Sequence, residues 1–211
     1  MLFTWNGKWV VSFVGNWLYS PLVLAVCGAR MKINGRENID KFNSYIYVAN
    51  HESQLDIPAL CVSLKLPLFF IAKQELKKIP VIGWYMAAVG HIFIDRSDRN
   101  KAMKSMKMAA QKIKSGKNVI SFPEGTRNKD GKMKLFKRGS FVIASEGDIG
   151  VVPVSIRGSR EILPSGSFTV KPGTIYVNIG RPIYHKDLSG PEVDEFAAYV
   201  KAEVVKLRNE F

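Results

Sequence analysis

After Arg30, short apolar runs alternate with amphipathic stretches along most of the chain, and this order restricts the fold more than any other feature. The runs are rich in β-branched and aromatic residues and are bounded by Gly, Pro, Asn or Lys. They predict strands at Tyr45–Ala49, Leu68–Ala72, His91–Asp95, Asn118–Phe122, Val151–Ile156 and Ile175–Ile179. The stretches between and after them predict helices at Ser53–Leu64, Glu75–Val89, Asp98–Ser115, Gly139–Glu146 and Pro191–Asn209, with Pro191 in the first turn of the last one. Alternation of this kind predicts one α/β domain, a mostly parallel sheet flanked by helices.

The N-terminal segment has a different composition. No residue from Trp9 to Ala29 is charged, and tryptophans and a tyrosine are spread through it. A spanning helix needs about 20 apolar residues, but polar side chains and Pro21 interrupt this run, and tryptophans favour the membrane interface. We therefore expect residues 1–30 to form two short anchoring helices in one leaflet, ahead of an α/β domain at residues 31–211. A single spanning helix and a buried helix of a soluble core are the alternatives.

The 211-residue chain carries a formal net charge of +13 and has a pI of about 9.8. Such an excess indicates a polyanionic partner, which could be nucleic acid, an anionic membrane or an acidic protein or phosphorylated substrate. A solvated basic surface without a partner is the alternative. A nucleic-acid-binding domain would explain the charge but not the apolar N-terminal run, and no recognised nucleic-acid motif is present. Cys27 and Cys61 lack metal or redox spacing and are interpreted as small buried hydrophobes.

The first candidate site follows the predicted strand Tyr45–Ala49. In the sequence from Asn50 to Asp56, His51 lies where an α/β sheet presents its ligands. If Ser53 caps the next helix, His51 can fold back toward Asp56, whose carboxylate would orient the imidazole as a general base. The alternative is that Ser53 and Asp56 form a capping box, which would give Asp56 a structural role. A zinc-binding H-E-x-x-H motif is excluded because Leu55 stands where the second histidine is needed.

The second candidate site is Phe122–Arg127, at the end of another predicted strand. Gly125 permits a tight turn, and Arg127 offers a bidentate fork for a phosphate. Glu124 could accept a hydrogen bond from a substrate hydroxyl or hold the arginine. Taken alone, an ordinary Pro-Glu-Gly turn would explain this sequence.

Taken together, the two sites resemble the paired blocks of the glycerophospholipid acyltransferase family. The resemblance covers Gly35 to Pro182 and includes four blocks in order. The segments that carry it are His51–Asp56, Lys73–Leu76 with Gly90–Arg96, Phe122–Arg127 with the later Phe136–Gly139, and Val152–Val154. Within the family, the chain is most similar to bacterial 1-acyl-glycerol-3-phosphate acyltransferases.

This resemblance implies acyl transfer from acyl-CoA or acyl carrier protein to the sn-2 hydroxyl of 1-acyl-glycerol-3-phosphate, which gives phosphatidic acid without an acyl-enzyme. An acyltransferase for another lysophospholipid or for glycerol-3-phosphate, and a non-catalytic lipid-binding protein, are the alternatives. It implies that His51 and Asp56 are catalytic. It also implies a substrate-binding set that includes a phosphate clamp beside His51, and this set comprises Lys73, Arg96, Glu124, Gly125, Thr126 and Arg127. Local ion pairs of the two arginines are the alternative to the clamp. We expect no metal and no cofactor, no nucleic-acid partner, and association with an anionic membrane surface at the cytoplasmic face of the cell membrane.

Overall fold

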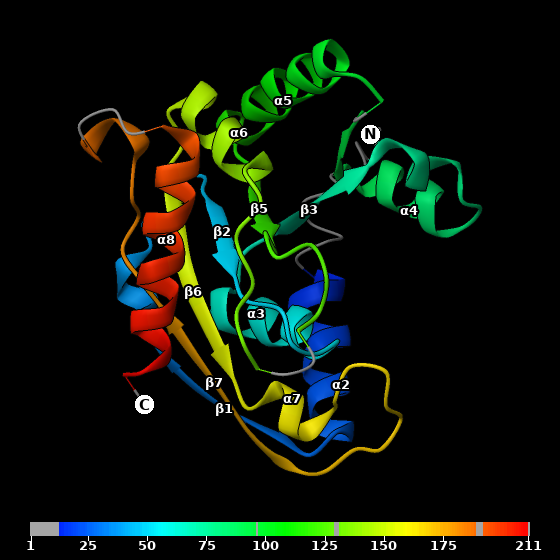
Figure 1. Cartoon of the computed structure of the whole chain (residues 1–211). Helices are drawn as coiled ribbons and strands as arrows, with labels where there is room; N and C mark the ends of the chain where they lie inside the picture. Colours follow the sequence, from blue (N-terminus) through cyan, green and yellow to red (C-terminus); the bar gives the residue numbers. More distant parts are fainter. Residues whose placement is uncertain (1–12, 96, 129–130, 189–191, 211) are drawn as a thin grey trace.

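The computed structural model describes residues 13–95, 97–128, 131–188 and 192–210 (Figure 1). Within them one seven-stranded sheet has the order β1-β7-β6-β2-β5-β3-β4. Its strands are β1 (Ala29–Asn34), β2 (Ile46–Ala49), β3 (Leu68–Lys73), β4 (Ile92–Ile94), β5 (Asn118–Ser121), β6 (Val151–Arg157) and β7 (Gly173–Ile179). All neighbours are parallel except β6 and β7, which are antiparallel. The predicted α/β class with a mostly parallel sheet is confirmed.

All six predicted strands are present, but β1 was not predicted. It is an edge strand, with Met31 and Ile33 half-buried and Arg30 and Lys32 exposed. Because only one face is covered, its sequence lacks the continuous apolar run of a central strand. The sheet therefore begins at Ala29, two residues inside the segment that we expected to be separate from the domain.

Helices cover both faces of the sheet (Figure 1). The elements outside the sheet are η1 (Phe13–Tyr19), α2 (Ser20–Val26), η2 (Arg36–Asn38), α3 (Asp56–Leu64), η3 (Gln74–Lys78), α4 (Ile82–Val89), α5 (Arg99–Lys114), α6 (Gly139–Gly147), α7 (Ser159–Ile162), η4 (His185–Leu188) and α8 (Val193–Arg208). Successive side chains of β2 lie on opposite faces of the sheet. Tyr47 and Ala49 pack in the cluster that includes residues of α2 and α3, and Ile46 and Val48 pack with α5, α6 and α8. Each fully buried large apolar side chain stabilises the fold by roughly 1.5–3 kcal/mol.

Two helix predictions need correction. The predicted helix Glu75–Val89 is broken into η3 and α4, because Pro80 favours an extended conformation at Ile79 and Val81 follows with a φ of 65°. The last helix begins at Val193 with Glu192 as its N-cap in a capping box. Pro191, expected in its first turn, lies outside the described residues. Asp98, predicted as the first residue of its helix, is the N-cap of α5 and accepts a hydrogen bond from the Lys101 backbone N–H at 2.9 Å.

The described part of the N-terminal segment consists of η1 and α2, and residues 1–12 lie outside the described residues. Asn16 is buried, and its Nδ2 donates to the Leu66 carbonyl at 3.0 Å. Several large apolar side chains nevertheless remain exposed here, namely Trp17, Leu18, Tyr19, Leu22 and Val26. Among the described residues, no helix has both the length and the apolar character needed to cross a membrane. The anchoring role of residues 1–30 stays a prediction.

Candidate active site

The end of β2 is fixed by the side chain of Asn50, which is 1% exposed. Its Nδ2 donates to the Ile156 carbonyl at 2.8 Å, and its Oδ1 accepts from the Ile156 backbone N–H at 2.8 Å. The Asn50 amide thus adds a pair of hydrogen bonds between the two chain segments beyond the end of the backbone pairing of β2 with β6. Because of this clamp, His51 leaves the sheet at a defined point on its carboxyl edge.

His51 and Asp56 form a close pair. His51 Nδ1 lies 2.8 Å from Asp56 Oδ2, the histidine side chain is 17% exposed and Asp56 is fully buried. The same oxygen accepts hydrogen bonds from the backbone N–H groups of Glu52 at 2.7 Å and Ser53 at 2.9 Å. Since a carboxylate can only accept, Nδ1 carries the hydrogen, and Nε2 is left as the basic nitrogen.

The structural role considered for Asp56, as part of a capping box with Ser53, is present only in part. Its bond from the Ser53 backbone N–H resembles one of the two bonds of a capping box, but α3 begins at Asp56 with Leu55 as its N-cap and without a side-chain capping bond. The Ser53 hydroxyl, however, accepts from the Leu55 N–H at 3.2 Å and donates to the Leu163 carbonyl at 2.7 Å. Asp56 therefore holds the turn and orients His51 at the same time.

The loop after β5 encloses His51 from a second side. The Phe122 ring stacks on the imidazole, with ring centroids 4.0 Å apart and an angle of 17° between the ring planes. Glu124, 3% exposed, accepts from the His51 backbone N–H at 2.9 Å and, through its other oxygen, from the Lys134 N–H at 2.8 Å. The Asn128 N–H donates to the His51 carbonyl at 2.7 Å. The two sequence motifs are therefore joined through the backbone of His51 itself.

This geometry favours a bracing role for Glu124 over contact with substrate, because both carboxylate oxygens already accept backbone hydrogen bonds. Gly125 has a φ of 77°, a backbone conformation that L side chains rarely adopt, so the turn favours glycine. Thr126 is exposed, and its Oγ1 accepts from Lys134 Nζ at 3.0 Å.

Arg127 is half-buried, and its Nη1 is buried without a hydrogen-bond partner among the described residues. The local ion pair with Glu124 that we considered is not formed. Lys73 is exposed at the end of β3, one strand away from β5. Arg96 lies outside the described residues, so the structure does not place the second half of the predicted clamp.

A buried ion pair beside the histidine was not predicted. Glu52 is 1% exposed, and its Oε1 contacts Nη1 of Arg208 at the end of α8. Burial raises the pKa of Glu52, and Arg208 opposes that rise. The partners are 156 residues apart, so no local sequence signal could have identified Arg208.

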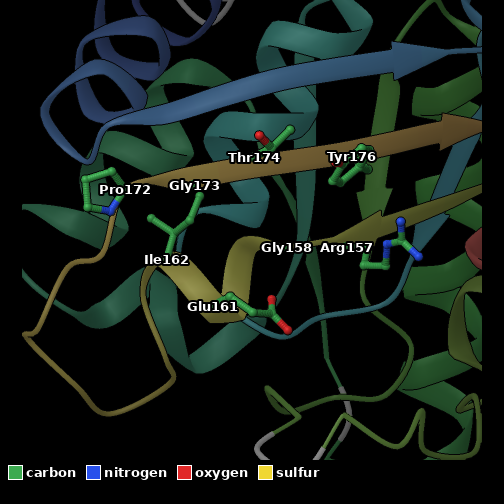
Figure 2. Close-up of a pocket in the computed structure, with 8 residues that line it drawn as sticks. All are labelled: Arg157, Gly158, Glu161, Ile162, Pro172, Gly173, Thr174 and Tyr176. Atoms are coloured by element: carbon green, nitrogen blue, oxygen red, sulfur yellow. The ribbon is translucent and has the colours of Figure 1, made fainter. Parts of the chain in front are cut away.

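A separate pocket of about 410 Å³ lies beside α7 and β7 (Figure 2). It is lined by Arg157, Gly158, Glu161, Ile162, Pro172, Gly173, Thr174 and Tyr176. The guanidinium of Arg157 lies over the Tyr176 ring, 5.0 Å from its centroid. None of the site residues predicted from the sequence lines this pocket, so we place the candidate chemistry at His51.

Within the described residues, no three or more His, Cys, Asp or Glu side chains converge as a metal site. Cys27 and Cys61 are free thiols, the first half-buried and the second buried. Burial raises the pKa of Cys61 to about 11.

Comparison with known proteins finds similar sequences that share one description. Residues 30–157 match the acyltransferase family. The chain is 34% identical over 178 residues to a chloroplastic 1-acyl-sn-glycerol-3-phosphate acyltransferase of Arabidopsis thaliana, covering 84% of this chain and 49% of that protein. It is 33% identical over 181 residues to the 1-acyl-sn-glycerol-3-phosphate acyltransferase of Pseudomonas aeruginosa, covering 84% and 69%.

A solved structure agrees with the sequence comparisons. The crystal structure of the 1-acyl-sn-glycerophosphate acyltransferase PlsC from Thermotoga maritima superposes with a TM-score of 0.77 at 34% identity, covering 97% of this chain and 82% of that one. The chain spans about half the length of the chloroplastic relatives from Arabidopsis thaliana and Brassica napus and of the Chlamydomonas reinhardtii relative that it matches.

Proposed function

Because this chain belongs to the acyltransferase family, we propose that it transfers a fatty acyl group from acyl-CoA or acyl carrier protein to the sn-2 hydroxyl of 1-acyl-glycerol-3-phosphate. The products are phosphatidic acid and the free thiol of the carrier. The observation that carries the proposal is the His51–Asp56 pair, held at 2.8 Å at the carboxyl edge of the sheet. The choice of reaction is supported by the relatives and the solved neighbour, which are 1-acyl-sn-glycerol-3-phosphate acyltransferases.

In the proposed mechanism, His51 Nε2 removes the proton from the acceptor hydroxyl as the oxygen attacks the thioester carbonyl. Asp56 accepts the hydrogen bond from Nδ1 and stabilises the imidazolium that forms. Collapse of the tetrahedral intermediate breaks the C–S bond, and the proton on His51 passes to the departing thiolate. General acid–base catalysis of this kind typically contributes a factor of about 10² to 10⁴.

The side chains around His51 support direct transfer rather than an acyl-enzyme. Ser53, the serine nearest to His51 in the sequence, is fully buried, and its hydroxyl is committed to the Leu163 carbonyl. Cys61 is buried in the apolar core, and its raised pKa keeps it a thiol at neutral pH. Neither group is placed as a nucleophile.

We assign the acceptor phosphate to Arg127, with Lys73 and Arg96 as further cations and with the Gly125–Thr126 turn beside it. The buried, unpartnered Nη1 of Arg127 supports this assignment, since a buried donor without an acceptor is costly until a ligand supplies one. Glu124 is assigned the bracing role described above. The assignment needs no metal or resident cofactor.

The proposed location is the cytoplasmic face of the cell membrane, with residues 1–30 as the anchor. The uncharged run Trp9–Ala29 and the net charge of +13 support it. Washing membranes with high salt and then with carbonate tests it. A protein held by residues 1–30 should stay in the pellet after both washes, whereas one held by charge alone should leave in high salt.

The direct test of the function is an acyl-transfer assay with purified protein in detergent or lipid. Given lysophosphatidate and an acyl thioester, it should release thiol and form phosphatidic acid, whereas monoacylglycerol, which lacks the phosphate, should be a poor acceptor. Equal use of another lysophospholipid would indicate a related acyltransferase with a different acceptor. No thiol release with any acceptor would indicate a non-catalytic lipid-binding protein and contradict the proposal.

A further inference from the structure

The segment from Gln74 to Val89, which we call the η3–α4 projection, exposes an apolar cluster. Figure 1 shows α4 standing out beyond the β3–β4 edge of the sheet, away from α6 and α8. The exposed side chains are Leu76, Ile79, Val81, Trp84 and Tyr85, of which Val81 is 72% exposed and Trp84 64%. Five exposed large apolar side chains within ten residues of one projecting segment indicate an interaction surface.

The projection is a built element and not a loose loop. A Cβ added to Gly83 would lie 2.2 Å from the Leu76 carbonyl oxygen and 2.7 Å from that of Lys77, so α4 packs directly on the backbone of η3. The Gly83 N–H also donates to the Ile79 carbonyl at 2.9 Å, and the Tyr85 N–H to the Val81 carbonyl at 2.9 Å. The apolar side chains are therefore held outward on a fixed frame.

The tip of the projection carries backbone strain. Val81 has a φ of 65° and a ψ of −65°, a conformation that is costly for a β-branched residue. Strain of this kind costs roughly 1–3 kcal/mol and persists where the surrounding structure imposes it, often at functional surfaces. Its effect here is to hold one of the most exposed apolar side chains at the turn between η3 and α4.

The charged residues beside the apolar cluster indicate what kind of partner binds this surface. Lys73, Lys77 and Lys78 flank the apolar cluster and are all exposed, and no ion pair engages them within the described residues. Glu75 is the acidic residue among them. Trp and Tyr with flanking lysines is the combination that suits the boundary between anionic headgroups and acyl chains.

The topology places the η3–α4 projection at the carboxyl edge of the parallel strands. β2, β5 and β3 are consecutive parallel neighbours, so their carboxyl ends lie at one edge. His51 follows β2, and the projection follows β3 directly at Gln74. A lipid surface under the projection would therefore face the end of the domain that carries His51.

We propose that the η3–α4 projection inserts Val81, Trp84 and Tyr85 into the interface of an anionic phospholipid bilayer, as a second membrane contact besides residues 1–30. The inference goes beyond the proposed acyl transfer, because insertion is measured without substrate or turnover. It would stand if the acceptor or even the reaction were different.

The test uses Trp84 as the probe in the full-length chain. In a variant with Trp5, Trp9 and Trp17 replaced by Phe, and with its fold checked by circular dichroism, Trp84 is the sole tryptophan. With vesicles of phosphatidylglycerol and phosphatidylcholine, its emission should shift to the blue and be quenched when the acyl chains are brominated. The matched control moves the sole tryptophan to position 42 by Trp84→Phe and Phe42→Trp. Phe42 is 98% exposed and precedes β2, at the opposite end of the sheet, so its emission should not change.

Two results would overturn the proposal. One is an unchanged, unquenched Trp84 emission while sedimentation shows that the protein is bound to the vesicles. The other is a concentration-dependent blue shift without lipid, together with a doubled mass, which would assign the surface to a second copy of the chain. In the supporting case, Lys77→Ser and Lys78→Ser should each weaken binding to anionic vesicles roughly five-fold, with little effect on neutral vesicles.

Discussion

The Glu124 carboxylate accepts a hydrogen bond from the backbone N–H of His51 at 2.9 Å. Its second oxygen accepts from the Lys134 N–H at 2.8 Å, so one buried side chain joins the loop after β2 to the loop after β5. The position of His51 along its loop thus depends on a residue 73 positions away. We therefore propose that Glu124 acts on the reaction through this backbone contact and not through the substrate.

Glu124→Gln tests that role. A Gln amide presents a donor to one of the two backbone N–H groups, so one buried N–H loses its acceptor at a cost of about 1–3 kcal/mol. We expect kcat to fall while KM for lysophosphatidate changes little. Steady-state kinetics check this, with Glu146→Gln on α6 as the surface control. A raised KM at unchanged kcat would instead indicate that Glu124 contacts the substrate.

Arg127→Ala should lower kcat/KM for lysophosphatidate far more than it alters use of the acyl donor. A charge-assisted bidentate pair is roughly twice as strong as a neutral hydrogen bond, and Lys should rescue only in part because it lacks the planar fork. The ratio of kcat/KM for lysophosphatidate to kcat/KM for monoacylglycerol measures the discrimination between the two acceptors. The variant should largely lose this discrimination. Arg181→Ala, an exposed arginine after β7 at the other end of the sheet, is the control. Equal slowing with both acceptors would make Arg127 a structural residue.

Arg208→Gln should destabilise the fold by about 3 kcal/mol, because it leaves the Glu52 carboxylate buried without its cation. Glu52→Gln in the same chain should restore part of the loss, which urea unfolding of the two single variants and the double variant measures. Burial already raises the pKa of Glu52, so its folded form binds a proton at higher pH than its unfolded form. The deficit of Arg208→Gln should therefore shrink as pH falls from 7 towards 5. Additive single effects would show that the pair is not coupled.

His91 makes the stability of the fold depend on pH in the opposite direction to Glu52. Burial, with a smaller contribution from the Lys117 charge, lowers its pKa from 6.5 to about 4, and its Nδ1 accepts from the Phe70 backbone N–H at 2.9 Å. The unfolded chain binds the proton first, so this contribution is present above pH 6.5 and is lost as pH falls towards 4, up to about 3 kcal/mol. His91→Asn keeps an acceptor but does not titrate. Its free energy of unfolding should fall less than that of wild type between pH 7 and pH 4, and parallel curves would contradict the assignment.

The sequence predicted the central strands because each is a short apolar run buried on both faces. It missed β1, whose alternating charged residues mark an exposed edge, and it merged η3 with α4 because periodicity gave no weight to Pro80. At the site, His51 and Asp56 lie five positions apart, so a strand followed by a helix is enough to bring them together. The clamp of Asn50 on Ile156 and the pairing of Glu52 with Arg208 join segments more than 100 residues apart, and only the tertiary fold brings them into contact.

The proposed acyl transfer depends most on His51 as a general base oriented by Asp56. The most direct measurement is the turnover of His51→Ala and Asp56→Asn with lysophosphatidate and acyl-CoA, after circular dichroism has shown both variants folded. His51→Ala should lose a factor of about 10² to 10⁴ in kcat, and Asp56→Asn should also be crippled, because the amide cannot hold the same tautomer. If folded His51→Ala keeps more than about a tenth of the wild-type rate, His51 is not the base and the proposed mechanism is wrong.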